Sequence, residues 1–320
     1  MNESAILIVS TVADTATDTV VQSLIARRVA HQRINTEDFP FERALTLDYQ
    51  AEGQTSIAIG GSTVKQTRSI WYRRVRSPAK PERMDPGIYD FCLRENRAAL
   101  LGGLLTQSTR WMSHPAAVWR AEFKPYQLRI AQEVGLRIPK TIVSNDPDAI
   151  RRAFRDFGPL IVKPTRSGHF HQAGEEFSIF TSRVTVEHLA ELDAAKWAPS
   201  IYQEWISKRY DIRVTCVGSR VFAAAIHSQT DPAAAVDWRQ TVNAGLPHSP
   251  IELPAPLVEQ LQRLLRRLDL AFGCLDLVLT PDNEYVFLEV NPSGQWLWLD
   301  DQLNFGISDT VAEWLTGGVA

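Results

Sequence analysis

Residues 287–296 read Phe287-Leu288-Glu289-Val290-Asn291-Pro292-Ser293-Gly294-Gln295-Trp296, an apolar strand that ends in polar side chains. An earlier apolar run, Phe272–Leu279, carries a single carboxylate at Asp276. The turn-forming segment 281–284 lies between the two runs and predicts a hairpin. We therefore expect Asp276 and Glu289 to face each other across two paired strands.

These two carboxylates and Asn291 form a candidate metal site. A carboxylate buried in an apolar strand is costly unless it is paired or binds a metal, and each strand carries one. Because side chains alternate along a strand, Glu289 and Asn291 project to the same face and complete an all-oxygen set that suits Mg²⁺ shared with phosphates. A purely structural interpretation is also open, with a satisfied Asp276 at a strand end and a Glu-Asn-Pro turn.

The spacing of these residues carries a family resemblance. The pattern Asp-x12-Glu-x-Asn resembles the metal-binding signature of ATP-grasp ligases, and residues 288–296 are similar to its form in graspetide (microviridin-type, omega-ester peptide) ligases. The resemblance implies an α/β chain with an ATP-grasp fold, in which two α+β lobes clamp ATP, preceded by a small Rossmann-like pre-ATP-grasp domain. The implied domains are an N-terminal domain over 1–118, a central lobe over 119–200, and a C-terminal lobe with the metal and catalytic site over 201–320.

Length and composition predict a soluble globular protein. With 320 residues and 44% hydrophobic content, the chain can bury the cores of two or three packed units. A net charge of -3 gives no global basic field, which disfavours nucleic acid or an anionic membrane as a partner. The three cysteines lack C-x-x-C spacing and indicate buried thiols in a reducing compartment, so we expect the cytoplasm. No apolar segment approaches the roughly 18 residues of a membrane span.

The N-terminal part of the chain predicts a small α/β domain. The apolar run Ala5–Ser10 is followed by residues 15–29, whose apolar positions follow helical spacing, and by further strand-like runs. The turn after the first run has none of the glycines that let a backbone approach a pyrophosphate. That absence argues against a dinucleotide-binding site.

Two arginines end one of these strands, in residues 70–75. An arginine at this place could grip a carboxylate, whereas the pattern alone favours a solvated strand end. Graspetide ligases have a similar Trp-Tyr-Arg-Arg in their N-terminal domain. That resemblance makes Arg74 a candidate substrate contact.

The resemblance also assigns two lysines to the nucleotide phosphates. Lys124 opens a predicted helix over 124–136, and Lys163 ends an apolar strand over 159–164. By its pattern alone, Lys124 would be a solvated lysine at a helix start. The polar loop 165–174 matches in position the loop that covers the triphosphate in ATP-grasp enzymes.

Residues 201–206 resemble the hinge between ATP-grasp lobes, where the backbone of a strand pairs with adenine. Asp211 follows at the spacing of the acidic residue that binds the ribose hydroxyls in that family. The implied adenosine-binding residues are Gln203, Glu204, Trp205, Ile206 and Asp211.

Two further arginines are candidates for binding phosphate or acyl phosphate. Arg213 lies in an Asp-x-Arg strand that is similar to the one in ATP-grasp ligases, although an ion pair on one strand face is the structural alternative. Arg239 ends the Asp-Trp-Arg of residues 237–239, which resembles a segment of the graspetide ligases. The candidate catalytic residues are therefore Arg74, Arg213 and Arg239.

The resemblance implies an ADP-forming ligase that uses ATP and Mg²⁺, with two metal ions expected. Asp or Glu side chains of a ribosomal precursor peptide would be activated as acyl phosphates, and Ser or Thr hydroxyls or Lys amines would then close macrocyclic esters or amides. A separate leader segment of the peptide would dock on the enzyme, and a homodimer is left open. The alternatives are a small-substrate ligase of the glutamate- or dipeptide-adding type and a non-catalytic ATP-binding regulatory protein. The intact Asp276, Glu289 and Asn291 argue against the last of these.

Overall fold

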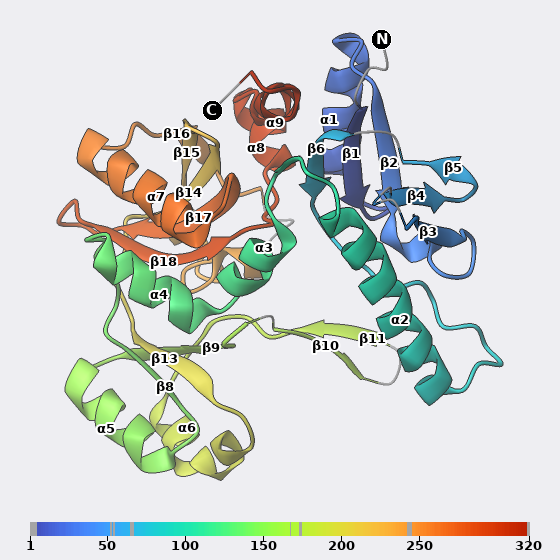
Figure 1. The fold of residues 1–320 in the computed structure, drawn as a ribbon. Helices are drawn as coiled ribbons and strands as arrows, with labels where there is room; N and C mark the ends of the chain where they lie inside the picture. The colour runs from blue at the N-terminus through green and yellow to red at the C-terminus, as the bar shows by residue number, and fades with distance from the viewer. Residues whose placement is uncertain are drawn as a thin grey trace.

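The computed structural model describes residues 5–318 except 52, 54, 65, 66, 167, 173, 174 and 242–244. Three units follow one another along the chain: an N-terminal α/β unit, a central α+β unit and a C-terminal unit built on a five-stranded sheet (Figure 1). No helix among the described residues is long and apolar enough to cross a lipid bilayer.

The N-terminal unit is a parallel sheet with one helix on each face. Its strands, in the order β2-β1-β6-β7, are β2 (His31–Asn35), β1 (Ala5–Ser10), β6 (Thr67–Tyr72) and β7 (Arg110–Trp111). Because side chains alternate along β1, Ile6 and Ile8 pack toward α1 (Thr15–Ala26), and Leu7 and Val9 pack toward α2 (Pro86–Leu105). A small antiparallel sheet adjoins them, with strands β3 (Leu45–Tyr49), β4 (Thr55–Ile59) and β5 (Ser62–Thr63).

The central unit is a four-stranded antiparallel sheet with helices packed on it. Its strands, in the order β12-β9-β13-β8, are β12 (Ser182–Arg183), β9 (Leu160–Lys163), β13 (Ser200–Glu204) and β8 (Thr141–Ser144). The helices are α5 (Pro147–Phe157) and α6 (Val186–Ala190). The apolar side chains of α5 meet those of β9 and β13 in one small core.

The structure contains a strand within the segment 165–174, which the sequence predicted to be a polar loop. The strand β10 (His169–Gln172) lies within it and pairs with β11 (Glu175–Ser178) as an antiparallel hairpin. Polar composition predicted a loop, but strand pairing uses backbone groups and does not require apolar side chains. Residues 167, 173 and 174 of the predicted loop lie outside the described residues.

The C-terminal unit is built on an antiparallel sheet that presents the two carboxylate-bearing strands. Its strands, in the order β16-β15-β14-β17-β18, are β16 (His248–Pro250), β15 (Arg220–Ile226), β14 (Tyr210–Val217), β17 (Phe272–Leu279) and β18 (Tyr285–Asn291). Five helices belong to it: α3 (Pro115–Ala121), α4 (Lys124–Glu133), α7 (Ala255–Leu268), α8 (Leu297–Leu303) and α9 (Ile307–Thr316).

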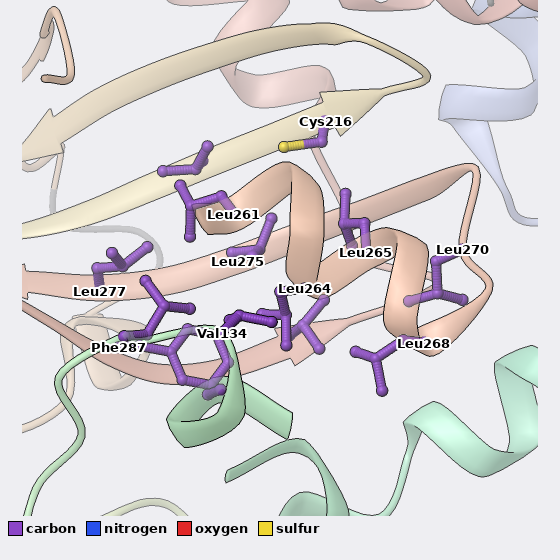
Figure 2. Close-up of a cluster of buried hydrophobic side chains, with 14 of the residues drawn as sticks. Val134, Cys216, Leu261, Leu264, Leu265, Leu268, Leu270, Leu275, Leu277 and Phe287 are labelled. Atoms are coloured by element: carbon purple, nitrogen blue, oxygen red, sulfur yellow. The ribbon is translucent and has the colours of Figure 1, made fainter. Parts of the chain in front are cut away.

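The amphipathic helix α7 builds the main core on this sheet. Its leucines recur at helical spacing and are all buried: Leu257, Leu261, Leu264, Leu265 and Leu268. Figure 2 shows the last four of these leucines against Leu275, Leu277 and Phe287 of the sheet, with Val134 from the end of α4 in the same cluster. Burying a leucine side chain contributes about 1.5–3 kcal/mol, so this helix fixes β17 and β18 firmly in place.

The domain division at 118 and 200 remains a prediction, and two elements pack across its boundaries. Helix α4 buries Leu128 and Ile130 in the core of the C-terminal unit rather than in the central one. Strand β13, which begins at Ser200, pairs with β8 and β9 of the central sheet. Chain order alone does not determine on which sheet a linking element buries its apolar face.

We expect Leu264→Ala in α7 to lower the free energy of unfolding by about 2–5 kcal/mol, because it leaves a cavity in the main core. The measurement is urea denaturation followed by circular dichroism. Leu105→Ala at the exposed end of α2 is the matched control, for which a change of about 0.5 kcal/mol is expected. Equal destabilisation by both substitutions would contradict the packing described here.

Candidate active site between the central and C-terminal units

A cleft with a cavity volume of about 80 Å³ opens between the central sheet and the C-terminal sheet. Nine of the predicted site residues line it: Lys163, Gln203, Glu204, Trp205, Ile206, Asp211, Arg239, Asp276 and Glu289.

A second, wider cleft of about 640 Å³ adjoins the first. The residues common to both are Lys163, Thr181, Arg239 and Glu289. Two more predicted residues, Lys124 and Asn291, line the second cleft. Glu289 thus lies where the two clefts meet, so a group bound in one can contact a group bound in the other.

The predicted opposition of the two carboxylates is confirmed by the strand register. Asp276 pairs with Glu289 across β17 and β18. The register then shifts, because Leu277 pairs with Phe287 and leaves Leu288 as the extra residue of a β-bulge. Both Leu288 and Glu289 line the first cleft. The bulge was not predicted, and it turns two consecutive residues toward the same site.

Asn291 is exposed at the end of β18 and lies opposite Cys274 in the neighbouring strand. Its side-chain oxygen accepts a hydrogen bond of 3.0 Å from the backbone N–H of Ser293. A carbonyl oxygen has two lone pairs, so this contact orients the amide and leaves an acceptor position toward the cleft.

Three cationic side chains surround the carboxylate of Glu289. Its Oε2 lies 3.1 Å from Nζ of Lys124 and 3.6 Å from Nζ of Lys163, and its Oε1 lies 3.7 Å from Nη1 of Arg239. Burial alone would raise the pKa of Glu289, but the three cations hold this pKa well below its ordinary value. The side chain is therefore a carboxylate at neutral pH.

The same cluster affects the pKa of Lys163. Burial lowers the pKa of Lys163, and the charge of Glu289 opposes that effect. Lys163 Nζ also lies 3.5 Å from the backbone carbonyl of Leu288. This contact with β18 positions the Lys163 side chain in the cleft.

Asp276 is held by a single arginine. Nη1 of Arg213 donates to both carboxylate oxygens, at 2.7 and 2.9 Å, and Nη2 donates to the carbonyl of Gln295 at 3.1 Å. Burial alone would lower the pKa of Arg213, but the charge of Asp276 more than compensates and raises that pKa. The predicted ion-pair alternative for Arg213 is thus present, with Asp276 rather than Asp211 as its partner.

The donor atoms fit Mg²⁺ held jointly with phosphates. Asp276, Glu289 and Asn291 offer only oxygens, which Mg²⁺ prefers. Among the described residues, no group of three or more His, Cys, Asp and Glu side chains gathers closely enough to hold a metal alone. Mg²⁺ takes part of its shell from phosphate oxygens and water in such sites, and the neighbouring lysines can neutralise the remaining phosphate charge.

The hinge residues line the other end of the first cleft. Strand β13 continues into Trp205, whose backbone N–H donates to the carbonyl of Pro159 at 2.8 Å. The side chain of Gln203 donates to Oγ1 of Thr141 at 3.0 Å. The Glu204 carboxylate accepts from the backbone N–H of Lys140 at 3.4 Å. These contacts fix the hinge to the central unit.

Asp211 is buried beside Lys208, a residue that the sequence did not single out. Nζ of Lys208 lies 2.7 and 2.9 Å from the two carboxylate oxygens, and Oγ of Ser228 donates to Oδ2 at 2.5 Å. Burial raises the pKa of Asp211, and these two partners act against that rise. Asp211 lines the first cleft, and its contact with ribose remains a prediction.

Arg239 is clamped by Asp237 of its own turn. The Asp237 carboxylate accepts from the Arg239 side chain at 2.7 and 2.8 Å and from its backbone N–H at 3.1 Å. The same carboxylate accepts from the backbone N–H of Thr181 at 3.1 Å, which ties the central unit to the C-terminal one. Burial alone would lower the pKa of Arg239, but Asp237 and Glu289 raise it.

Arg74 lies apart from the other candidates. Like Arg213, it lines neither cleft, but it contacts none of the described site carboxylates, and its Nη2 lies 3.5 Å from the carbonyl of Ser293 in the loop after β18. The structure therefore brings Arg213 and Arg239 together at the carboxylates, while Arg74 reaches only the edge of that group.

Comparisons with known proteins agree with this architecture. The family model described as "MvdD pre-ATP grasp domain" matches residues 5–118. The solved structure of a RiPP-associated ATP-grasp ligase from Chryseobacterium gregarium, in complex with ADP and a leader and core peptide, is similar at 28% identity and a TM-score of 0.92, covering 99% of this chain and 98% of that one. The macrocyclase MdnC from Microcystis aeruginosa MRC, bound with precursor peptide MdnA, is similar at 31% identity and a TM-score of 0.87, covering 98% and 100%.

A curated relative is named as a ligase that joins glutamate to LysW. Glutamate--LysW ligase ArgX from Sulfurisphaera tokodaii is 24% identical over 183 residues, which span 57% of this chain and 64% of that protein. The matched region is thus less than two thirds of that ligase. Together with the structural similarities, it confirms the predicted ATP-grasp fold preceded by a pre-ATP-grasp domain.

We expect Lys163→Ala to weaken ATP binding about tenfold to a hundredfold, which corresponds to one lost charge-assisted hydrogen bond to a phosphate. The free protein should unfold at nearly the same temperature, because Lys124 and Arg239 still neutralise Glu289. Isothermal titration calorimetry with ATP gives the affinity. Lys196→Ala, which removes an exposed lysine paired with Asp193, is the control. An unchanged ATP affinity in Lys163→Ala would show that Lys163 does not bind the phosphates.

Proposed function

Since the chain belongs to the graspetide ATP-grasp ligases, we propose that it joins side chains of one ribosomal precursor peptide into macrocycles in a reaction that consumes ATP. The observation that carries this proposal is the meeting of two clefts at Glu289. The narrower cleft has the lining for a nucleotide, and the wider one has room for a peptide segment beside it. The enzyme is an ADP-forming ligase with ATP and Mg²⁺ as its cofactors.

The reaction has two steps in which all atoms are accounted for. A carboxylate oxygen of an Asp or Glu side chain attacks the γ-phosphorus, the bond to the β-phosphate oxygen breaks, and ADP leaves. A Ser or Thr hydroxyl, or a Lys amine, then attacks the acyl carbon. The C–O bond to phosphate breaks, and inorganic phosphate leaves with the electron pair, while the proton of the nucleophile passes to phosphate or solvent. An ester or amide closes the ring.

Each group of residues has a role in this proposal. Lys124 and Lys163 bind the phosphates and reduce their repulsion of the incoming carboxylate. Asp276, Glu289 and Asn291 hold Mg²⁺, which when bound neutralises phosphate charge and orients the phosphates. The remaining assignments are Arg213 and Arg239 at the acyl phosphate, Arg74 at a substrate carboxylate, and Gln203, Glu204, Trp205, Ile206 and Asp211 at adenosine.

The peptide partner is the second part of the proposal. Both similar solved structures contain a precursor peptide or its leader and core segments. We propose that a leader segment docks on this chain and raises the effective concentration of the reacting side chains, so that weak contacts at the clefts suffice. The homodimer stays a prediction. A cytoplasmic location is also a proposal, supported by the free thiols of Cys92, Cys216 and Cys274.

A small-substrate ligase is the second candidate, and the similarity to Glutamate--LysW ligase ArgX favours it. Both kinds of ligase would use the same nucleotide residues. The similarities favour the peptide, since the two peptide-bound ligases match at 28% and 31% identity over at least 98% of this chain, against 24% identity over 57% of it for the glutamate ligase.

We expect the precursor peptide encoded next to this gene to lose the mass of one water per ring when it is incubated with enzyme, ATP and Mg²⁺. Mass spectrometry gives the number of rings, and mild base distinguishes esters, which open, from amides, which persist. Omitting ATP is the control. An unmodified precursor together with ATP-dependent ligation of free amino acids would replace the macrocycle proposal with the small-substrate one.

A further inference from the structure

The loop that follows Asn291 is held by the N-terminal unit. Nη1 of Arg73 donates to the carbonyl of Gly294 at 2.9 Å, and Nη2 donates to the side-chain oxygen of Gln295 at 3.0 Å. These contacts join residues more than 200 positions apart in the sequence. Arg73 lies at the end of β6, so the parallel sheet of the N-terminal unit directly supports this loop.

Arg73 is itself fixed by charge and by aromatic packing. Its guanidinium lies 4.3 Å from the ring centroid of Trp296 and 5.8 Å from that of Phe272. Its Nε lies 3.3 Å from Oδ2 of Asp14, and both side chains are buried. Burial lowers the pKa of Arg73 to about 10, with Asp14 acting against this shift, so the pair is charged at neutral pH.

Stability alone does not account for this buried ion pair. Removing two charges from water costs several kcal/mol per ion, and apolar side chains of similar volume are often as stable. Asp14 accepts from Ser10 and Thr17 at 2.9 and 3.0 Å through Oδ2, while its Oδ1 has no hydrogen-bond partner among the described residues. A function for the pair in orienting the loop accounts for its presence.

The opposite side of the loop is held by the site arginine. Arg213, which binds Asp276, also donates to the carbonyl of Gln295 at 3.1 Å. Between the two arginines, Gly294 packs so tightly that an added Cβ would lie 2.4 Å from Cβ of Cys274. Its N–H donates to the carbonyl of Asn291 at 3.2 Å. Arg73 and Arg213 therefore hold the loop 293–295 from two sides. Asn291 contacts the loop directly, and Asp276 is linked to it through Arg213.

We propose that Asp14 and Arg73 are positioning residues for the metal site, acting through the loop 293–295 on Asn291 and, by way of Arg213, on Asp276. The proposal rests on the proposed metal-binding role of Asp276, Glu289 and Asn291. The planar fork of arginine reaches two acceptors at once, whereas a lysine provides a single point charge. The N-terminal unit thus takes part in metal binding although none of its described residues lines the first cleft.

The test compares ADP binding by calorimetry with Mg²⁺ and with a chelator in Arg73→Lys, which keeps the charge beside Asp14. Partners that orient metal ligands typically affect metal affinity by about 10- to 100-fold. We expect the Mg²⁺ concentration for half-maximal strengthening of ADP binding to rise about tenfold. ADP affinity in the chelator should stay within about twofold of wild type. Asp14→Asn, a second variant, should shift the Mg²⁺ requirement in the same direction.

Two controls separate the possible failures. Arg110→Lys changes another arginine of the N-terminal unit, one that stacks 4.2 Å from the ring centroid of Trp314, and should leave the Mg²⁺ requirement unchanged. Glu289→Gln should abolish the Mg²⁺ effect. If it does not, the proposed metal site is wrong. If it does, and Arg73→Lys either behaves as wild type or loses ADP affinity equally with and without Mg²⁺, the positioning role is overturned.

Discussion

Two carboxylates that face each other in a largely apolar sheet are the constraint on which this structure depends. Asp276 and Glu289 are paired across β17 and β18, where like charges repel. Cations from other segments are needed to offset this repulsion. Three cations converge on Glu289: Lys124 from α4, Lys163 from β9 and Arg239 from the short 3₁₀ helix Trp238–Thr241. Arg213 from β14 binds Asp276. The need for charge compensation thus brings the central and C-terminal units together.

The same arrangement explains how the site can bind a nucleotide. Under the proposed function, the lysines that neutralise Glu289 would move a short distance to phosphate oxygens when Mg²⁺ binds the carboxylate. The site exchanges one set of ion pairs for another, so no charge is left buried without a partner. Asp237 limits this freedom for Arg239, because it holds that side chain by three hydrogen bonds, whereas the lysines are flexible.

Patterns among neighbouring residues predicted the elements of the fold that consecutive residues form. The segment 281–284 predicted the hairpin, and the helical spacing of apolar positions in residues 15–29 predicted α1. The bulge at Leu288, the partner of Asp211 at Lys208 and the clamp of Arg73 on Gly294 were not predicted, since each depends on contacts between segments that are paired only in three dimensions. The resemblance singled out Arg74, whereas only the structure shows that the neighbouring Arg73 is buried against the loop 293–295.

The most direct test of this account is a crystal structure of the enzyme with Mg²⁺ and a non-hydrolysable ATP analogue. The account predicts that a Glu289 oxygen lies about 2.0–2.1 Å from the metal ion and that Nζ of Lys124 and Lys163 lies within hydrogen-bond distance, about 2.7–3.2 Å, of phosphate oxygens. A structure in which both lysines keep their contacts with Glu289 while the metal ion and triphosphate bind elsewhere would contradict it.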